Sequence, residues 1–324
     1  MRLVILGAGA IGGAIGGLLA RAGRDVLLVA RGAQLAALET SGLTVERPDG
    51  GTFVQRVPVA SWARPIDWRA GDVLMIATKT QDVAAALEQA APPPHVPIAC
   101  ATNGVEAERI ALRRARDVYA LSLLLPATYL TPGVVQIWSS PVPGVIELGH
   151  YPDGTGELGH AIAGELAAGG FDCEVRPSVM KWKRGKLLSN LANGAEALCG
   201  PAARQSDLFA RARAEGRACY AAAGLSCTTE ADDNARRAVM SSRPIAGAVR
   251  SGGSTWQSLA RGGSLEIDYL NGEIALLGRL HGVPTPVNEG LQRAVADAAR
   301  EGAEPGAMPL AELERRVAAA SDQT

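Results

Sequence analysis

This sequence has few lysines, no excess of either charge and no Cys-x-x-Cys pair. Its 324 residues carry a formal net charge of −1, so the composition gives no electrostatic support for a nucleic-acid partner or an anionic membrane surface. The five cysteines are an odd number without paired spacing, which indicates neither a disulfide framework nor a zinc site. We therefore expect a cytoplasmic protein without a metal centre.

One stretch without charge, Leu3 to Ala20, has 18 residues, the length at which a membrane-spanning helix becomes a candidate. Six of these residues are glycine, and each glycine disfavours a continuous helix by about 1 kcal/mol relative to alanine. The stretch also lacks the basic leader of a signal peptide. We expect neither a signal peptide nor a membrane span here.

The same glycines form a motif between an expected strand (residues 2–6) and an expected helix (residues 10–22). Gly7-Ala8-Gly9-Ala10-Ile11-Gly12 is a GxGxxG sequence in the strand–turn–helix context that the motif requires. Gly7 permits the tight turn, Gly9 lets a pyrophosphate approach the backbone, and Gly12 allows close helix–strand packing. The first N–H groups of the helix, at Ala10 and Ile11, then face the phosphate. The motif predicts a dinucleotide site.

The end of the next expected strand, residues 25–30, discriminates between NAD and NADP. NAD sites usually carry an acidic residue here, which binds the ribose 2′-hydroxyl. No acidic residue occurs between Val26 and Ala37, and Arg31 stands at the end of the strand. A guanidinium binds the 2′-phosphate of NADP with paired hydrogen bonds. We therefore predict NADPH as cofactor, with a surface arginine in an arginine-rich chain as the alternative.

Strand-like and helix-like segments alternate up to about residue 177. This alternation predicts an α/β domain of the Rossmann type, with a doubly wound, mostly parallel sheet. Ligands bind beyond the carboxyl ends of such strands, where Lys79 and Asn103 occur. The expected strands include 72–78, 96–102, 117–125 and a late antiparallel pair, 133–140 with 144–151.

The remaining residues, 178–324, show no convincing strand. We predict an all-α second domain that begins at residue 178, so that the NADP-binding domain covers residues 1–177. The expected helices are 178–199, 205–223, 228–241, 266–281 and 287–301, followed by a last short helix.

Lysine is rare, because only four of the 32 basic residues are lysines, and Lys181, Lys183 and Lys186 fall within six positions. On one helix, Lys186, Asn190 and Asn193 lie on a single stripe. Arginine stays protonated near neutral pH, whereas lysine can act as a general acid when burial or a like charge lowers its pKa. We predict that Lys186 protonates an oxygen that gains charge during hydride transfer; the alternative is an ordinary surface lysine. Lys181 and Lys183 are expected to be ordinary surface lysines.

A second polar cluster lies in residues 251–272. Ser254 falls in a Gly/Ser loop, and Glu266 begins the expected helix 266–281. A carboxylate near Lys186 can hold the substrate or keep the lysine protonated. The alternative for Glu266 is a simple interaction with the helix dipole.

These motifs, in this order, resemble the ketopantoate reductase (2-dehydropantoate 2-reductase) family over almost the whole chain. The Lys186–Asn190 pair and the stretch "LEIDYLNG" are the most specific part of the resemblance. The resemblance implies a Rossmann domain followed by a helical domain, often dimeric through the latter. It also implies reduction of 2-dehydropantoate to (R)-pantoate by NADPH, a step of pantothenate and coenzyme A biosynthesis.

The resemblance assigns roles by motif. Lys186 is implied as the general acid, Glu266, Asn190, Ser254 and Asn103 as substrate contacts, and Lys79 as a cofactor contact. Asn103 is also implied near the nicotinamide. We add Asn193 as a substrate contact, because it is displaced by one position from an asparagine that the family usually carries.

Three positions depart from the family pattern, and all three concern the substrate. Gly194 stands where the second asparagine of the helix usually occurs, Ser258 where an aspartate is frequent, and Ser251 where an asparagine commonly contacts the substrate. The departures question the substrate more than the reaction. The alternatives are therefore an NADPH-dependent reductase of a different 2-oxo or β-keto acid and a non-catalytic NADP-binding sensor.

Overall fold

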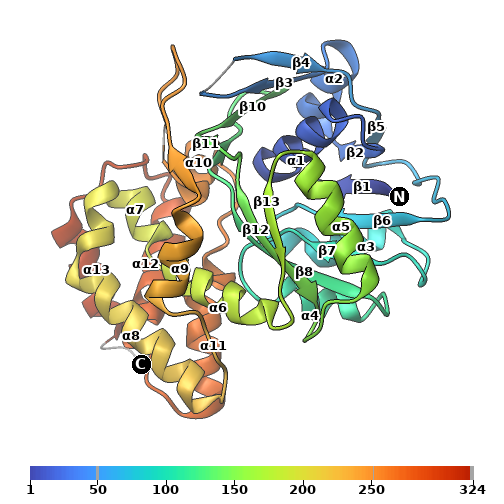
Figure 1. Cartoon of the computed structure of the whole chain (residues 1–324). Coiled ribbons are helices and arrows are strands. Elements are labelled where there is room, and N and C mark those ends of the chain that lie inside the picture. The colour runs from blue at the N-terminus through green and yellow to red at the C-terminus, as the bar shows by residue number, and fades with distance from the viewer. Residues whose placement is uncertain (49–50, 251, 322–324) are drawn as a thin grey trace. The chain divides into compact units, whose positions relative to one another are not determined.

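The computed structural model describes residues 1–48, 51–250 and 252–321 (Figure 1). Its contacts divide the chain into two compact units. Unit 1 comprises Met1–Lys183 and Thr229–Arg250, and unit 2 comprises Arg184–Thr228 and Ser251–Thr324. The division falls inside helix α6 (Val179–Asn190), whereas the sequence predicts a domain boundary at residue 177.

Unit 1 is built on an eight-stranded sheet with the order β13-β12-β8-β7-β6-β1-β2-β5. All neighbouring strands are parallel except β12 and β8, which confirms the mostly parallel α/β prediction. The strands are β1 (Arg2–Leu6), β2 (Val26–Ala30), β5 (Val59–Ser61), β6 (Asp72–Ile76), β7 (Ile98–Cys100), β8 (Val118–Leu124), β12 (Val145–His150) and β13 (Asp172–Val175).

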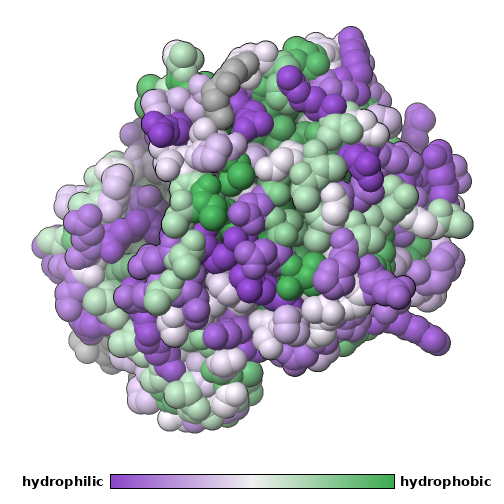
Figure 2. Space-filling view, in the orientation of Figure 1, coloured by the Kyte–Doolittle hydropathy of each residue, from purple (hydrophilic) through white to green (hydrophobic). Residues whose placement is uncertain are grey.

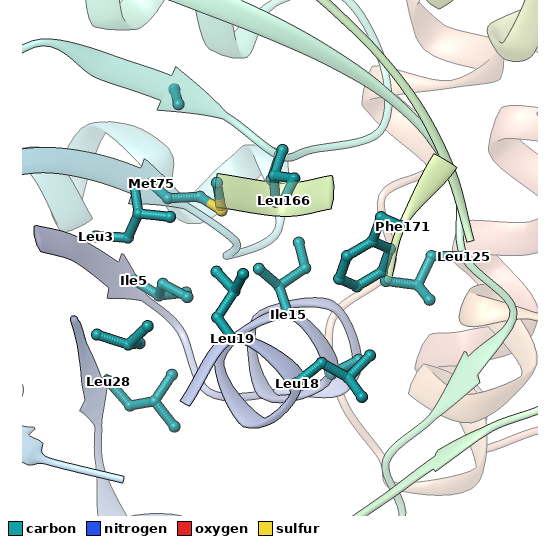
Figure 3. Close-up of a cluster of buried hydrophobic side chains, with 14 of the residues drawn as sticks. Leu3, Ile5, Ile15, Leu18, Leu19, Leu28, Met75, Leu125, Leu166 and Phe171 are labelled. Carbon is teal, nitrogen blue, oxygen red and sulfur yellow. The ribbon is translucent and has the colours of Figure 1, made fainter. Parts of the chain in front are cut away.

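Alternate residues of the central strand β1 enter two separate cores, as expected for a sheet that is covered on both faces. Leu3 and Ile5 pack with Ile15 and Leu19 of helix α1 (Ala10–Arg21) and with Leu166 (Figure 3). Val4 and Leu6 pack on the opposite face with residues of α3 and α4. The remaining helices of unit 1 are α2 (Gly32–Thr40), η1 (Thr80–Asp82), α3 (Val83–Ala90), α4 (Ala107–Leu112), α5 (Glu157–Ala168) and α9 (Glu230–Arg237).

The late antiparallel pair is a wrong prediction. Strand β10 (Val134–Ile137) joins a second sheet, ordered β4-β3-β10-β9, whereas β12 lies in the main sheet antiparallel to β8. Residue alternation indicates which face of a strand is buried, but it does not specify the partner strand. The other strands of the second sheet are β3 (Leu43–Glu46), β4 (Phe53–Gln55) and β9 (Ala127–Thr128).

A strand also occurs after residue 178, contrary to prediction. β14 (Met240–Ser242) pairs with β11 (Ser139–Pro141), and both belong to unit 1. Arg236 of α9 is buried against Glu147 of β12, so this late segment returns to the first unit by both backbone and side-chain contacts.

Unit 2 is helical within its described residues. Its elements are α7 (Asn193–Cys199), η2 (Pro201–Gln205), α8 (Asp207–Ala222), α10 (Ser254–Ala260), η3 (Ile267–Tyr269), α11 (Asn271–His281), α12 (Pro286–Arg300) and α13 (Leu310–Ser321). Within the described ranges, no helix combines the length and the apolar character needed to cross a bilayer. Hydrophilic residues cover much of the face shown in Figure 2, and the hydrophobic ones form small patches.

Candidate active site

Of the three glycines in the motif, Gly9 is the one beside which the structure leaves room for a phosphate. Gly7 has φ +105°, and a Cβ at Gly12 would lie 1.9 Å from the carbonyl oxygen of Gly7, so the protein itself requires both glycines. A Cβ at Gly9, in contrast, would meet no atom nearer than Tyr129 Cδ1, at 4.0 Å. Gly9 precedes the first turn of α1, where Ala10 and Ile11 direct their N–H groups out of the helix end. The open space beside Gly9 is the cradle that a pyrophosphate needs.

A buried glutamine that the sequence analysis missed supports this turn. Gln34 of α2 donates a hydrogen bond from Nε2 to the Ala8 carbonyl (2.7 Å) and accepts one at Oε1 from Gly133 N–H (2.7 Å). The amide thus links the turn to the loop that precedes β10. A glutamine three residues after Arg31 carries no recognisable sequence signal, because its partners are distant in the chain.

The other cofactor residues predicted in unit 1 lie at the same edge of the sheet. Strands β1, β2, β6 and β7 are mutually parallel, so the segments that follow them emerge at one edge. Lys79 follows β6, and Asn103 follows β7. Thr80, which is 1% exposed, donates from Oγ1 to the backbone carbonyl of Asn103 at 3.1 Å. The structure therefore brings the Lys79 and Asn103 segments into direct contact.

Arg31 lies at the end of β2 and is exposed. Its guanidinium carbon lies 5.4 Å from the centroid of the Trp62 ring, within the range of a cation–π interaction. Trp62 follows β5, which pairs with β2, so the neighbouring strand supplies the aromatic ring. The guanidinium is thus held at the strand end where a ribose 2′-phosphate is expected.

The polar stripe predicted on one helix is only partly present. Lys186 and Asn190 lie one turn apart on α6, but this helix ends at Asn190 and Asn193 begins α7. The Oδ1 of Asn193 accepts a hydrogen bond from Arg204 Nη2 at 2.7 Å, and Arg204 also bonds Glu196. Asn193 is buried and serves the packing of α7 against η2. The single stripe that suggested Asn193 as a substrate contact does not exist.

A buried asparagine pair holds the break between α6 and α7. Asn271 Nδ2 donates to the Leu191 carbonyl (3.2 Å) and to Asn288 Oδ1 (3.0 Å), and Asn288 donates to the Ala212 carbonyl (2.9 Å). Both asparagines are fully buried. The asparagine of the stretch "LEIDYLNG" is Asn271, so this network gives it a structural role. Asn271, the first residue of α11, thus holds the carbonyl of Leu191, the residue that follows Asn190.

The second polar cluster also differs from the prediction. Glu266 does not begin a long helix; it precedes the short helix η3, and α11 starts only at Asn271. Ser254 is the exposed first residue of α10 rather than a loop residue. Ser258, one turn later, is buried and donates to the Ser254 carbonyl at 3.0 Å. Ser251 lies outside the described residues. Lys186, Asn190, Ser254 and Glu266 all belong to unit 2.

Lys183 is not the surface lysine that the sequence analysis expected. Its side chain is 2% exposed and forms an ion pair with Glu108 of α4, which is 0% exposed, and its Nζ donates to the Thr102 carbonyl at 3.1 Å. Burial raises the pKa of the neighbouring Cys100 thiol well above its usual range; Glu108 raises it further, and Lys183 partly opposes this. Lys181, as predicted, has an exposed side chain, 3.7 Å from Asp232. The scarcity of lysine in this chain marks Lys183 as much as Lys186.

Within the described residues, no group of three or more His, Cys, Asp or Glu side chains is placed so that it could hold a metal ion.

The family models and the similar proteins of known name indicate one family. The family model "Ketopantoate reductase PanE/ApbA" matches residues 3–153, and its C-terminal counterpart matches residues 179–299. A 2-dehydropantoate 2-reductase of Mesorhizobium japonicum is 31% identical over 319 residues, which cover 88% of this chain and 94% of that protein. One of Pyrococcus horikoshii is 30% identical over 194 residues, which cover 59% of this chain and 62% of that protein.

Solved structures share the fold over nearly the whole chain. A PanE/ApbA family ketopantoate reductase from Ralstonia eutropha superimposes with a TM-score of 0.76 at 26% identity, covering 93% of this chain and 99% of that one. A D-mandelate dehydrogenase, solved with NADH and anilino(oxo)acetate, gives 0.79 at 22% identity with the same coverage. At that identity the second likeness concerns the fold alone.

The space at Gly9 generates a test of the phosphate site. Gly9→Ala is expected to leave Tm unchanged, because Gly9 has φ −84° and its Cβ would meet open space. The same methyl group should weaken NADPH binding about 10-fold, or ~1.4 kcal/mol, by occupying the position of the pyrophosphate. Titration of NADPH fluorescence measures the effect. Gly164→Ala on α5, where a Cβ also meets open space, is the control; unchanged NADPH affinity in Gly9→Ala would contradict the assignment.

Proposed function

This chain belongs to the ketopantoate reductase family of oxidoreductases, and from that premise we propose that it reduces 2-dehydropantoate to (R)-pantoate with NADPH. The observation that carries the proposal is the grouping of Gly7–Gly12, Arg31, Lys79 and Asn103 at one edge of the parallel sheet. That edge is where a sheet of this kind binds a dinucleotide. A cytoplasmic location and a homodimer through the helical unit belong to the same proposal.

The cofactor assignment rests on two features of unit 1. The open cradle at Gly9 and the N-terminus of α1 suit the pyrophosphate, and Arg31 beside Trp62 suits a 2′-phosphate rather than a free 2′-hydroxyl. Lys79 and Asn103, joined through Thr80, are the groups proposed to contact the cofactor farther along the same edge.

The proposed chemistry assigns each step to a side chain of this protein. Bound NADPH would supply a hydride to the substrate's keto carbon. Lys186 would give its proton to the keto oxygen, so that no alkoxide accumulates, and would regain a proton from solvent. Asn103, Asn190 and Ser254 would orient the substrate, and Glu266 would bind a substrate hydroxyl group or keep Lys186 protonated. Orientation and stabilisation of the developing negative charge would supply most of the rate.

A different 2-oxo or β-keto acid is the second candidate, and the packing of Gly194 favours it. A Cβ at Gly194 would lie 2.8 Å from Val295 and 3.1 Å from Ile267, so the asparagine usual in the family does not fit here. Ser258, where the family often carries an aspartate, is buried and bonded within its own helix. The asparagine and the aspartate that are usual in the family at these two positions are therefore both absent from this chain.

A substrate panel tests the proposal. NADPH oxidation at 340 nm is followed with 2-dehydropantoate, other 2-oxo acids and β-keto acids at equal concentrations. The highest kcat/KM with 2-dehydropantoate is expected. A higher value with another acid would replace the substrate, and tight NADPH binding without any turnover would favour a non-catalytic sensor.

If Lys186 is the general acid, its removal should lower the rate of the reaction without weakening cofactor binding. Lys186→Ala should lower kcat by roughly 10²-fold, the usual contribution of a general acid, with the NADPH Kd unchanged. Lys186→Arg should be similarly slow, because an arginine keeps the charge but does not release a proton near neutral pH. Steady-state kinetics give both values, and Lys181→Ala is the control. Near wild-type activity in Lys186→Arg would contradict the general-acid role and would show that only a positive charge is needed at this position.

Arg31 should govern the choice between NADPH and NADH. Arg31→Ala is expected to weaken NADPH about 10- to 100-fold, the range of a charge-assisted hydrogen bond, and to change NADH less than about 2-fold. Trp62→Leu should have a smaller effect in the same direction, since it removes only the cation–π contact. Equal losses for both cofactors would refute the 2′-phosphate assignment.

A further inference from the structure

Lys183 and Glu108 join three segments of unit 1 in a place that excludes water. Lys183 lies in the second turn of α6, and Glu108 is the second residue of α4. Thr102 lies between β7 and α4, and its carbonyl accepts a hydrogen bond from Lys183 Nζ at 3.1 Å. The two charged side chains are 2% and 0% exposed. The residue after Thr102 is Asn103, whose own backbone carbonyl accepts a hydrogen bond from buried Thr80. Two consecutive carbonyls are therefore held by buried side chains.

Stability alone does not account for this ion pair. Apolar residues of similar volume usually stabilise a buried site as well as an ion pair does, or better, because no charge has to leave water. Ala107 and Ala111, on the same helix as Glu108, are buried as well, as is Cys100 at the end of β7. In the described part of the chain, moreover, Glu108 Oε2 and Thr102 Oγ1 are buried without a protein hydrogen-bond partner. The cluster is thus incompletely satisfied, which makes it costly to bury and calls for an explanation other than stability.

We propose that Lys183 and Glu108 form a positioning pair, which fixes the Thr102–Asn103 segment to α6 and thereby sets the place of Asn103 beside the nicotinamide end of the cofactor. The inference rests on the proposed function for the identity of that cofactor. Glu108 holds the ammonium in place, and the ammonium holds the Thr102 carbonyl. The same helix carries Lys186 one turn after Lys183, so a single buried contact orders the start of the helix and the loop together.

The test separates positioning from folding by comparing single and double variants. Lys183→Met leaves a buried carboxylate unpaired and is expected to lower Tm. The double variant Lys183→Met with Glu108→Leu removes both charges and should recover most of that Tm, because the site becomes apolar. Thr102 still lacks its donor in the double variant. Lys181→Met, two residues away with an exposed side chain, is the matched control.

The decisive readout is binding of two ligands without substrate. Adenosine 2′,5′-bisphosphate is the adenosine half of NADPH. It carries the 2′-phosphate that Arg31 is proposed to bind and one phosphate of the pyrophosphate, but it has no nicotinamide. The double variant should bind it with unchanged Kd, yet bind NADPH about 5- to 10-fold more weakly, as expected when one positioning hydrogen bond is lost. Its kcat should fall by roughly 10²-fold, because a displacement near 1 Å has an effect of this size.

Two outcomes would overturn the inference. Wild-type NADPH affinity in the double variant would make the pair merely structural. An equal loss for NADPH and for the bisphosphate would place its effect on the whole nucleotide site. Failure of the wild-type protein to reduce any 2-oxo acid would instead remove the proposed function, and the ratio of the two Kd values would still decide the role of the pair.

Discussion

The close approach of helix α1 to the strands beneath it is the constraint on which the rest of unit 1 depends. A Cβ at Gly12 would lie 1.9 Å from the carbonyl oxygen of Gly7, and Cβ atoms at Gly13, Gly16 and Gly17 would lie 2.6–2.9 Å from side chains of β2, β3 and β10. The helix therefore rests on both sheets at once. Its N-terminus lies at the edge where β1, β2 and β6 end, which is the geometry expected of a dinucleotide site.

Buried polar side chains then connect this edge to distant parts of the chain. Gln34 ties the glycine turn to the loop before β10, and Thr80 ties the Lys79 segment to Asn103. Lys183 ties α6 to the same loop, and Asn271 controls the opposite end of that helix. Each of these groups binds a backbone carbonyl. Because each contact is made to a carbonyl, it fixes the course of the backbone whatever side chain the contacted residue carries.

The helical unit shows how packing changes a set of candidate site residues. The helix break after Asn190 separates Asn193 from Lys186, and the neighbours of Gly194 occupy the space of a larger side chain. Lys186 and Asn190 thus remain a pair on one helix, while their usual companion is absent. Lys186 alone is proposed for proton transfer, whereas Asn190 and the replaced position are proposed for substrate recognition. The departure at Gly194 therefore bears on the proposed substrate and leaves the proposed acid in place.

The sequence by itself determined the mostly parallel α/β sheet, the glycine turn, the strand ends with Arg31, Lys79 and Asn103, and most helices, because these depend on local periodicity and on glycine spacing. Only the tertiary structure decided the partners of β10 and β12, the return of β14 to unit 1, the break before Asn193 and the burial of Lys183. The burial of Lys183 and the helix break depend on contacts between residues 75 and 80 positions apart, Lys183 with Glu108 and Asn271 with Leu191. Local patterns indicate which face of an element is buried. They do not specify which other segment packs against that face, because this depends on residues far away in the sequence.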